Sequence, residues 1–273
     1  MIDSILLATD GSDAAHVAER YGTALGGKLR ARLSGLSVVE DRLAQGLRAE
    51  SLGIPPGPVD AAEAFLKARA EAASRRLGDL ARQRGAECHT ELLRGAADDR
   101  IVERGQGVDL IVVGRDGEHA AGRTALIGST ANGVLRKTHK PVLVVPTGAE
   151  WGGAILLAFD GSPGSRLAAR HAVELASRAE QPVHVFVDSK DKGRAAARFD
   201  EVRRLLGSLP SPAREVSSTL GRPDVKIVDT AKSARAGLIV MGAYGRNRIT
   251  EYFLGSNASA VVRTSPVAVL LSR

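Results

Sequence analysis

Several residue types that often mark a particular chemistry are scarce in this sequence. Cys88 is the single cysteine among 273 residues, so the chain can form neither an internal disulfide nor a cysteine-based metal cluster. This scarcity favours a reducing compartment, and we expect a cytoplasmic protein. Aromatic residues make up only 3% of the chain, which argues against surfaces on which nucleic-acid bases stack.

Long apolar runs and clustered charge are also missing. No run approaches the roughly 18 apolar residues that a membrane span requires, and the first residues lead directly into a strand without a signal core. The formal net charge is +7, but the arginines are spread along the expected helices and interleaved with Asp and Glu. We therefore interpret the basic residues as solvated helix faces, and expect neither nucleic acid nor membrane as a partner.

An internal repeat divides the chain. Four landmarks recur in the same order in its two halves, which indicates two copies of one unit. They are ILLATDGS (5–12) with ILLAFDGS (155–162), DLIVVG (109–114) with GLIVMG (237–242), Gly-Ser (128–129) with Gly-Ser (255–256), and PVLVVP (141–146) with PVAVLL (266–271). We expect one domain over residues 1–147 and a second over residues 151–273.

Within each copy, strand-like and helix-like apolar periods alternate as β-α-β-α-β-α-β-α-β. This order predicts an α/β, Rossmann-like fold of two tandem doubly wound five-stranded parallel sheets, in the strand order 3-2-1-4-5, flanked by helices. Ligands of such sheets bind outside the carboxyl ends of strands 1 and 4. The apolar last strands, PVLVVP and PVAVLL, are expected to pair with each other as an internal pseudo-dimer. Whether two chains associate further as a homodimer is left open.

The stretch 41–60 has no close counterpart in the second copy. The residues Pro55–Pro58 read PPGP, which argues against regular structure there. A surface loop, a flap over a site and an arm that grips another subunit are the three interpretations.

The spacing Gly242-x2-Gly245-x9-Gly255-Ser256 suggests an anion site. Gly242 would let a strand turn sharply, Gly245 would let the backbone approach a ligand, and Gly255-Ser256 would open a helix whose free amides favour an anion. Arg246 and Arg248 would add positive charge nearby. Ordinary turn and cap chemistry is the alternative for each glycine alone, and the case rests on the combination.

An aspartate stands at the end of the first strand of each copy. Asp10-Gly11-Ser12 and Asp160-Gly161-Ser162 lead from a strand into a helix, so we expect an Asx-type turn with a Ser or Asp cap at each. In a nucleotide complex either aspartate could help to hold Mg²⁺ through the phosphates. The six histidines show no spacing typical of metal ligands, and the sequence assigns no residue to a metal and none to catalysis.

Taken together, the ATDGS and AFDGS turns, the LIVVG and LIVMG strands and the glycine spacing resemble the universal stress protein family, in its nucleotide-binding branch. The resemblance covers nearly the whole chain. It implies ATP binding, with an aspartate near the nucleoside and the glycine loop on the ribose and phosphates. By position these roles fall on Asp160, Gly242, Gly245, Gly255, Ser256 and Asn257, with the adenine wall near Val187 and Asp188.

The first copy departs from the family pattern. Ten residues separate Gly117 from Gly128, and Glu118-His119 stands where the second copy has Arg246-Asn247. A carboxylate there would repel phosphate oxygens unless it turned away. The candidate residues of this copy are Asp10, Gly114, Gly117, Gly128, Ser129 and Thr130.

Three functions agree with these patterns. The first is an ATP-binding stress regulator, with or without Mg²⁺, that hydrolyses ATP slowly or not at all because no general base is evident. The second is an adenine-nucleotide hydrolase or adenylating enzyme of the same superfamily. Such an enzyme would be expected to carry an SGGxDS-like loop, from which DGSDAA and DGSPGS depart. The third is an interaction protein whose pockets have degenerated.

Overall fold

The computed structural model describes residues 1–40, 57–117, 127–189, 191–207, 209, 214–218, 222–244 and 254–273. Each half contains five strands alternating with four helices in this described part, which confirms the expected order. The first half comprises β1 (Ser4–Thr9), α1 (Asp13–Leu29), β2 (Arg32–Val39), α3 (Gly57–Gln83), β3 (Cys88–Arg94), α4 (Ala97–Gly105), β4 (Leu110–Gly114), α5 (Ser129–Lys137) and β5 (Val142–Val145). The second comprises β6 (Ala154–Ala158), α6 (Pro163–Ala179), β7 (Val183–Asp188), α7 (Lys192–Leu205), β8 (Arg214–Ser218), α8 (Pro223–Ser233), β9 (Ala236–Gly242), α9 (Ser256–Thr264) and β10 (Ala268–Ser272).

Part of the predicted 41–60 loop is helical. Residues 57–60 belong to α3, so the expectation of irregular structure is wrong there. The reason is that a proline in the first turn of a helix removes an N–H that has no intrahelical partner, and Pro58 takes that position. Residues 41–56 lie outside the described residues.

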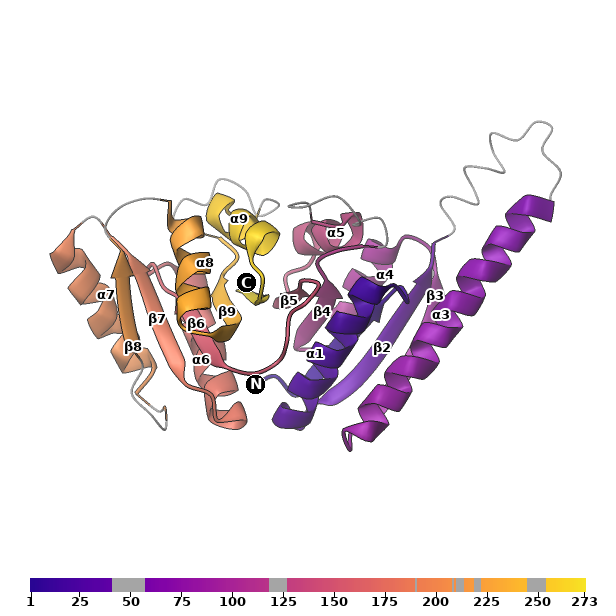
Figure 1. The fold of residues 1–273 in the computed structure, drawn as a ribbon, viewed down its shortest axis with the longest axis horizontal. Coiled ribbons are helices and arrows are strands. Elements are labelled where there is room, and N and C mark those ends of the chain that lie inside the picture. The colour runs from indigo at the N-terminus through magenta and orange to yellow at the C-terminus, as the bar shows by residue number, and fades with distance from the viewer. Residues whose placement is uncertain are drawn as a thin grey trace.

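The strands form one ten-stranded sheet in the order β3-β2-β1-β4-β5-β10-β9-β6-β7-β8. Each half has the expected order 3-2-1-4-5, and neighbouring strands within each half pair in parallel. The halves meet where β5 and β10 pair antiparallel, with Val144 opposite Val269 and Leu143 opposite Leu270. This confirms that the last strands of the two copies pair. The two predicted sheets are therefore continuous with each other (Figure 1).

Helices cover both faces of the sheet, and each face has its own apolar core. On one face, residues of α1, α3, α6 and α7 pack against alternate strand residues such as Leu7 and Leu157. On the other, residues of α4, α5, α8 and α9 pack against the strand residues that point the opposite way, such as Leu6 and Leu156. Both cores run through the two halves without interruption, so the joined halves bury apolar surface along their whole junction.

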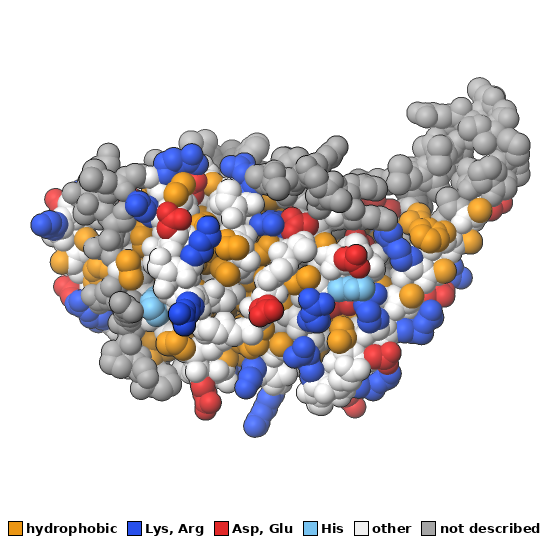
Figure 2. Space-filling view, viewed as in Figure 1, with side chains coloured by type: hydrophobic (Ala, Val, Ile, Leu, Met, Phe, Trp, Pro, Cys, Tyr) orange, Lys and Arg blue, Asp and Glu red, His pale blue; other side chains and the backbone are white. Residues whose placement is uncertain are grey.

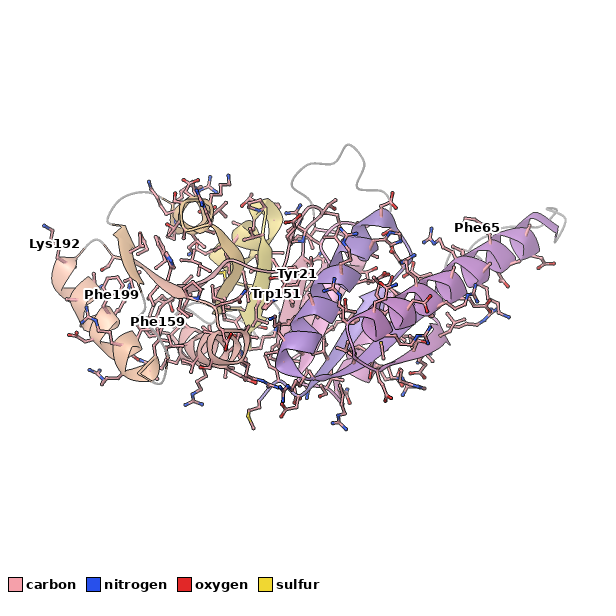
Figure 3. The ribbon with its side chains drawn as sticks, turned by 60° about the horizontal axis from the view of Figure 1, so that its bottom comes forward. Tyr21, Phe65, Trp151, Phe159, Lys192 and Phe199 are labelled. Atoms are coloured by element: carbon pink, nitrogen blue, oxygen red, sulfur yellow. The ribbon has the colours of Figure 1, made fainter. Side chains whose placement is uncertain are left out.

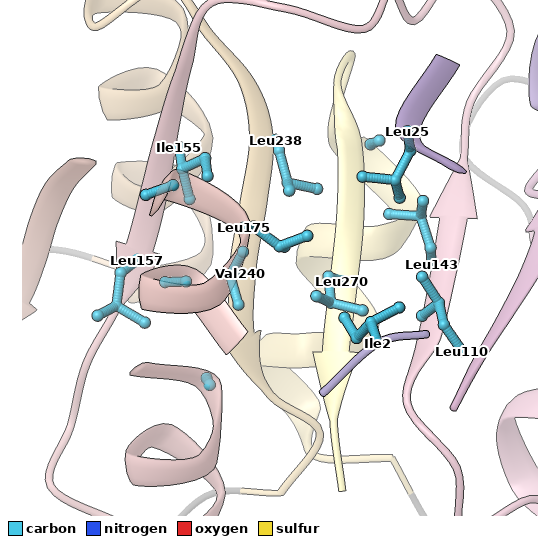
Figure 4. Packing of buried hydrophobic residues seen from close by; sticks show 14 of the residues in the cluster. Ile2, Leu25, Leu110, Leu143, Ile155, Leu157, Leu175, Leu238, Val240 and Leu270 are labelled. Atoms are coloured by element: carbon cyan, nitrogen blue, oxygen red, sulfur yellow. The ribbon is translucent and has the colours of Figure 1, made fainter. Parts of the chain in front are cut away.

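The junction is packed mainly by aliphatic side chains. Leu143 of β5 and Leu270 of β10 belong to one cluster with Ile2, Leu25 and Leu175 (Figure 4). Beside it, the rings of Tyr21 and Trp151 meet edge to face with their centroids 5.4 Å apart (Figure 3). The buried Tyr21 hydroxyl donates to the carbonyl of Gly237 in the other half at 2.9 Å. The packed ring and the hydrogen-bonded hydroxyl of Tyr21 thus connect α1 to the second copy.

On the face shown in Figure 2, Lys and Arg side chains are distributed over both halves and lie among Asp and Glu. This agrees with the interpretation of the basic residues as solvated helix faces. Among the described helices, none combines the length and apolarity that crossing a membrane would demand.

Candidate functional site

Two cavities lie at corresponding places in the two halves. Each is at the carboxyl ends of the first and fourth strands of its half, where the winding of the sheet reverses. Both cavities open to solvent; the empty space in and at the mouth of the N-terminal cavity is about 630 Å³, and that of the C-terminal cavity is about 1300 Å³. The apolar wall of the first includes Leu36, Val38, Ile101 and Val113. The wall of the second includes Phe159, Phe186, Ile227 and Met241.

The aspartate that follows the first strand forms the expected turn in both halves. An Oδ1 of Asp10 accepts from the Ser12 N–H at 2.9 Å, and Asp160 does the same with Ser162. Each serine hydroxyl then accepts an amide in the first turn of the next helix, at 3.2 Å in both halves. The Asx turns are confirmed, and of the two expected cap residue types the structure has serine in both halves. They hold Asp10 and Asp160 at the cavity walls by one carboxylate oxygen.

The last helix of each half begins at its cavity. Gly128 and Gly255 precede α5 and α9, and neither helix start carries a side-chain cap. Intrahelical bonding to the cap carbonyls begins only at the Asn132 and Ser259 N–H groups. The amides between each cap glycine and that first bonded residue therefore have no partner within the helix, and the positive end of the helix dipole lies at the cavity. An anion is the ligand that such a helix start favours.

The glycine that ends the fourth strand has a different role in each half. A Cβ on Gly242 would lie 2.8 Å from the Gly164 carbonyl carbon and 2.9 Å from the Ser165 nitrogen, at the start of α6. A Cβ on Gly114 would meet nothing closer than 3.6 Å. The φ angle of Gly242 is outside the left-handed region, so the expected sharp turn is not why glycine stands there. Close packing of β9 on α6 is the reason.

The predicted residues of the second copy gather at one cavity, with exceptions. Asp160, Gly242, Gly255, Ser256 and Asn257 all line it. Gly245, Arg246 and Arg248 lie outside the described residues. Val187 does not line this cavity and is fully buried in the core on the other face of the sheet.

The position of Val187 follows from strand alternation. Successive side chains of β7 point to opposite faces, so Phe186 and Asp188 lie at the cavity and Val187 does not. Of the two residues expected near an adenine wall, Asp188 therefore lines the cavity and Val187 does not, and Phe186 lines it in place of Val187. All six candidates of the first copy, Asp10, Gly114, Gly117, Gly128, Ser129 and Thr130, line the N-terminal cavity. Glu118 and His119 fall outside the described part of the chain.

Arg198 of α7 lines the C-terminal cavity and was missed in the sequence. Its side chain is only 7% exposed, and its Nη1 donates to the Asp188 carbonyl at 2.7 Å. A signal for it was present, because Arg198 lies three residues after Ala195 and directly before Phe199, on the apolar stripe of that helix. An arginine on a buried stripe needs polar partners, and the Asp188 carbonyl is one of them.

A buried polar cluster beside the N-terminal cavity was also missed. Glu19 of α1 is 1% exposed, accepts from the Thr9 hydroxyl, and is held by Arg76 of α3 with Nε to Oε2 at 2.8 Å. Thr9 lines the cavity. The signal was the one difference between ILLATDGS and ILLAFDGS, where Phe159 replaces this threonine. The same turn is thus supported by an ion pair in one half and by an aromatic ring in the other.

Asp116 gives the N-terminal cavity a second carboxylate. Burial acts to raise its pKa, but bonds from the Arg115 guanidinium and from the Thr147 N–H and hydroxyl hold the pKa below its ordinary value. Both Thr147 bonds measure 2.9 Å. Asp116 is therefore ionised at neutral pH. In the second half, Tyr244 lines the C-terminal cavity two residues after the corresponding glycine.

Comparison with known proteins agrees with this architecture. A model of the universal stress protein family matches residues 1–146 and again residues 153–273. A universal stress protein of Synechocystis is 25% identical, with 99% of each chain covered. One of Mycobacterium tuberculosis is 30% identical over 208 residues, which cover 67% of this chain and 68% of the relative.

Among solved structures, a universal stress protein from Archaeoglobus fulgidus has the same fold, with a TM-score of 0.76 at 20% identity. The similarity covers 100% of this chain and 99% of that one. Because the family model matches each half in turn, this chain belongs to the universal stress protein family as a tandem member with two copies of the family unit.

Proposed function

We propose that this protein binds ATP in both cavities and acts as a nucleotide-dependent stress regulator. One observation carries the proposal: in each half, an apolar-walled cavity at the ends of the first and fourth strands meets the uncapped start of a helix. An adenine nucleotide combines a flat apolar base with an anionic tail, which matches these two parts. The cytoplasm stays the predicted compartment.

In the C-terminal cavity the phosphates would lie at the start of α9, with the hydroxyl of Ser256 and the guanidinium of Arg198 as further donors. The base would pack on Phe186, Ile227 and Met241. A helix start contributes roughly 0.3–1 kcal/mol per charge, and about 2 kcal/mol when partly buried. Micromolar affinity needs about 8 kcal/mol, so the apolar wall has to supply much of the difference.

The side chains present fit Mg²⁺ only together with phosphates. Among the described residues, no group of three His, Cys, Asp or Glu side chains is arranged to hold a metal alone. Each cavity does contain two carboxylates, Asp10 and Asp116 in the first, and Asp160 and Asp188 in the second. Magnesium is commonly held by one or two carboxylates plus phosphate oxygens, so these residues would hold a nucleotide-bound ion.

Regulation is favoured over efficient hydrolysis by the residues at the cavities. Their described linings include no histidine, lysine or cysteine. The carboxylates of Asp10, Asp116 and Asp160 could act as bases, but each already accepts a hydrogen bond within the fold. A hydrolase of the same superfamily and an interaction protein with degenerate pockets are the alternatives. Turnover of ATP at an ordinary enzymatic rate would favour the first, and the lack of any bound nucleotide would favour the second.

The test is calorimetric titration of the purified protein with ATP, together with mass spectrometry of any ligand released on denaturation. We expect two molecules of ATP per chain. Ser256→Asp would place a carboxylate at the start of α9, where it repels phosphate but agrees with the helix dipole, so the variant should fold and lose the C-terminal site. Ser129→Asp is the matched variant for α5. Unchanged stoichiometry in both variants, or no binding by the wild type, would refute the proposal.

A further inference from the structure

An arginine of the first half reaches the last helix of the second half. Arg115 directly follows β4, and its Nη1 donates to the carbonyls of Ser265 at 2.7 Å and Arg263 at 3.3 Å, at the C-terminal end of α9. Through Nε and Nη2, at 2.9 and 3.2 Å, the same guanidinium holds Asp116, which lines the N-terminal cavity. Arg115 thus joins the wall of one cavity to the helix that begins at the other.

The second half returns the same kind of contact. Arg273 follows β10, and its Nη1 donates to the Thr138 carbonyl at 2.6 Å while Nη2 donates to the Leu135 carbonyl, at the C-terminal end of α5. Its Nη1 also lies 2.9 Å from the Tyr244 hydroxyl, and the guanidinium stands 5.2 Å from the centre of that ring. Tyr244 lines the C-terminal cavity.

These contacts are crossed between the halves. Asp116 and Tyr244 occupy the same position, two residues after the glycine that ends the fourth strand. Each is held by an arginine whose other contacts are the free carbonyls ending the other half's last helix. Both helices have nine residues, about 13 Å at 1.5 Å per residue, and both lie at the junction of the halves (Figure 1). Each is therefore a short rigid rod with one end at its own cavity and the other on the opposite half.

We propose that Arg115 and Arg273 are positioning residues that couple the two cavities, so that a ligand in one changes the affinity of the other. The inference rests on the proposed function, since it needs a nucleotide at the helix starts. A phosphate on the amides of α5 fixes that helix, and its far end then holds Arg273 and the Tyr244 wall in place. The second nucleotide finds a wall that is already ordered.

Electrostatics give the coupling its sign. An anion at the start of a helix and a cation at its end both agree with the helix dipole, so each reinforces the position of the other. The first ligand orders part of the second cavity, so the second ligand loses less conformational entropy when it binds, and this produces positive cooperativity. Coupling between sites typically changes affinity by a factor of 5 to 150. We expect a value at the low end of this range, roughly five-fold, because the coupling passes through a few hydrogen bonds.

The experiment is ATP titration of the full chain as wild type and as Arg115→Lys with Arg273→Lys. Lysine keeps the charge but loses the planar fork that reaches two carbonyls and a side chain together. We expect the second ATP to bind the wild type roughly five-fold more tightly than independent sites allow, and the two sites of the double variant to titrate independently. Identical isotherms for wild type and variant, or independent sites in the wild type, would overturn the inference while leaving the proposed function intact. Failure of the wild type to bind ATP would overturn both.

Arg178→Lys is the matched control. Arg178 of α6 also crosses between the halves, donating to the Ile2 carbonyl at 3.0 Å and to the Leu29 carbonyl at the end of α1, but it lines neither cavity. Its replacement should leave the cooperativity unchanged. Loss of cooperativity in this variant would mean that any weakened junction has the effect, and would overturn the specific role of Arg115 and Arg273.

A second readout needs no arginine variant. In Ser256→Asp, ATP can occupy only the N-terminal cavity, and hydrogen exchange then reports what happens in the other half. We expect ATP to slow exchange of the backbone amide at Tyr244, which lines the empty cavity. Exchange that slows only within the first half would overturn the coupling.

Discussion

Replacing the glycine that ends the fourth strand should affect the two halves very differently. In the second half, β9 and the start of α6 approach backbone to backbone, and a Cβ on Gly242 would lie 2.8 Å from the Gly164 carbonyl carbon. In the first half the corresponding helix residue is Ala14, which already carries a Cβ. A methyl group on Gly114 would come no closer than 3.6 Å to its nearest neighbour and 3.8 Å to the Ala14 carbonyl oxygen.

The magnitude follows from these distances. Ordinary contacts begin near 3.4 Å, so in Gly242→Ala the end of β9 and the start of α6 must separate by roughly 0.6 Å. That helix start is held by the Ser162 cap, so it cannot move without strain. Overpacking of this kind costs about 1–3 kcal/mol. Gly114→Ala should be neutral, or stabilise by up to about 1 kcal/mol, because alanine restricts the unfolded chain.

Thermal unfolding followed by far-UV circular dichroism, without nucleotide, measures both variants. At about 2–4 °C per kcal/mol, we expect Gly242→Ala to unfold roughly 2–12 °C below the wild type, and Gly114→Ala at or slightly above it. Fluorescence of Trp151, which packs on Tyr21 at the junction, shows whether the halves separate in the same transition. Equal midpoints for Gly242→Ala and the wild type, or equal losses in the two variants, would refute the packing argument.

Three further outcomes follow from buried charges. Arg198→Gln should lower the affinity for ATP about ten-fold or more, because a charged hydrogen bond contributes about 1.5–3 kcal/mol, and should leave the affinity for adenosine nearly unchanged. Equal losses of affinity for the two ligands in calorimetry would contradict a contact between Arg198 and phosphate. Glu19→Gln should lower the free energy of unfolding by about 2 kcal/mol in urea, since Arg76 and Thr9 lose the buried carboxyl group that accepts from both, and an unchanged midpoint would show that the pair contributes nothing. The folded-state pKa of Asp116 is lowered, so its contribution to stability is present above the unfolded pKa of about 3.9 and is lost as pH falls through the folded value. Asp116→Asn should therefore flatten the acid side of the melting-temperature profile, and a profile as steep as that of the wild type would contradict this.

The repeats were sufficient to predict the architecture. Strand order, alternation and the Asx turns at Asp10 and Asp160 depend on local patterns and on topology rules, and all of these are visible in one sequence. The pairing of β5 with β10 was also accessible, because an apolar last strand at the edge of a sheet needs a partner.

Details of the cavities were harder to predict because they depend on direction and distance. Val187 was placed one residue away from the side chains that reach the cavity, and in a strand one residue reverses the face. A sharp turn was predicted at Gly242, but glycine is needed there because α6 packs closely against it, and such a tertiary contact is not visible in the local sequence. Arg198 and Glu19 were detectable only as charged residues on apolar helix stripes. Arg198 bonds to the Asp188 carbonyl at the end of β7 and Glu19 to Arg76 of α3, and neither contact follows from a local pattern.

The crossed contacts also show what a tandem chain permits that two identical subunits do not. In a symmetric dimer, the same residue would make the crossing contact in both subunits, so both cavities would be coupled through identical contacts. Here the arginine follows the fourth strand in one half and the last strand in the other, and it holds a carboxylate in the first case and a phenol ring in the second. The Asp116 contact is a charged pair backed by Thr147, whereas the Tyr244 contact joins a neutral ring to a cation. Because the two contacts differ in chemistry, Arg115→Lys and Arg273→Lys made singly should reduce the cooperativity by different factors.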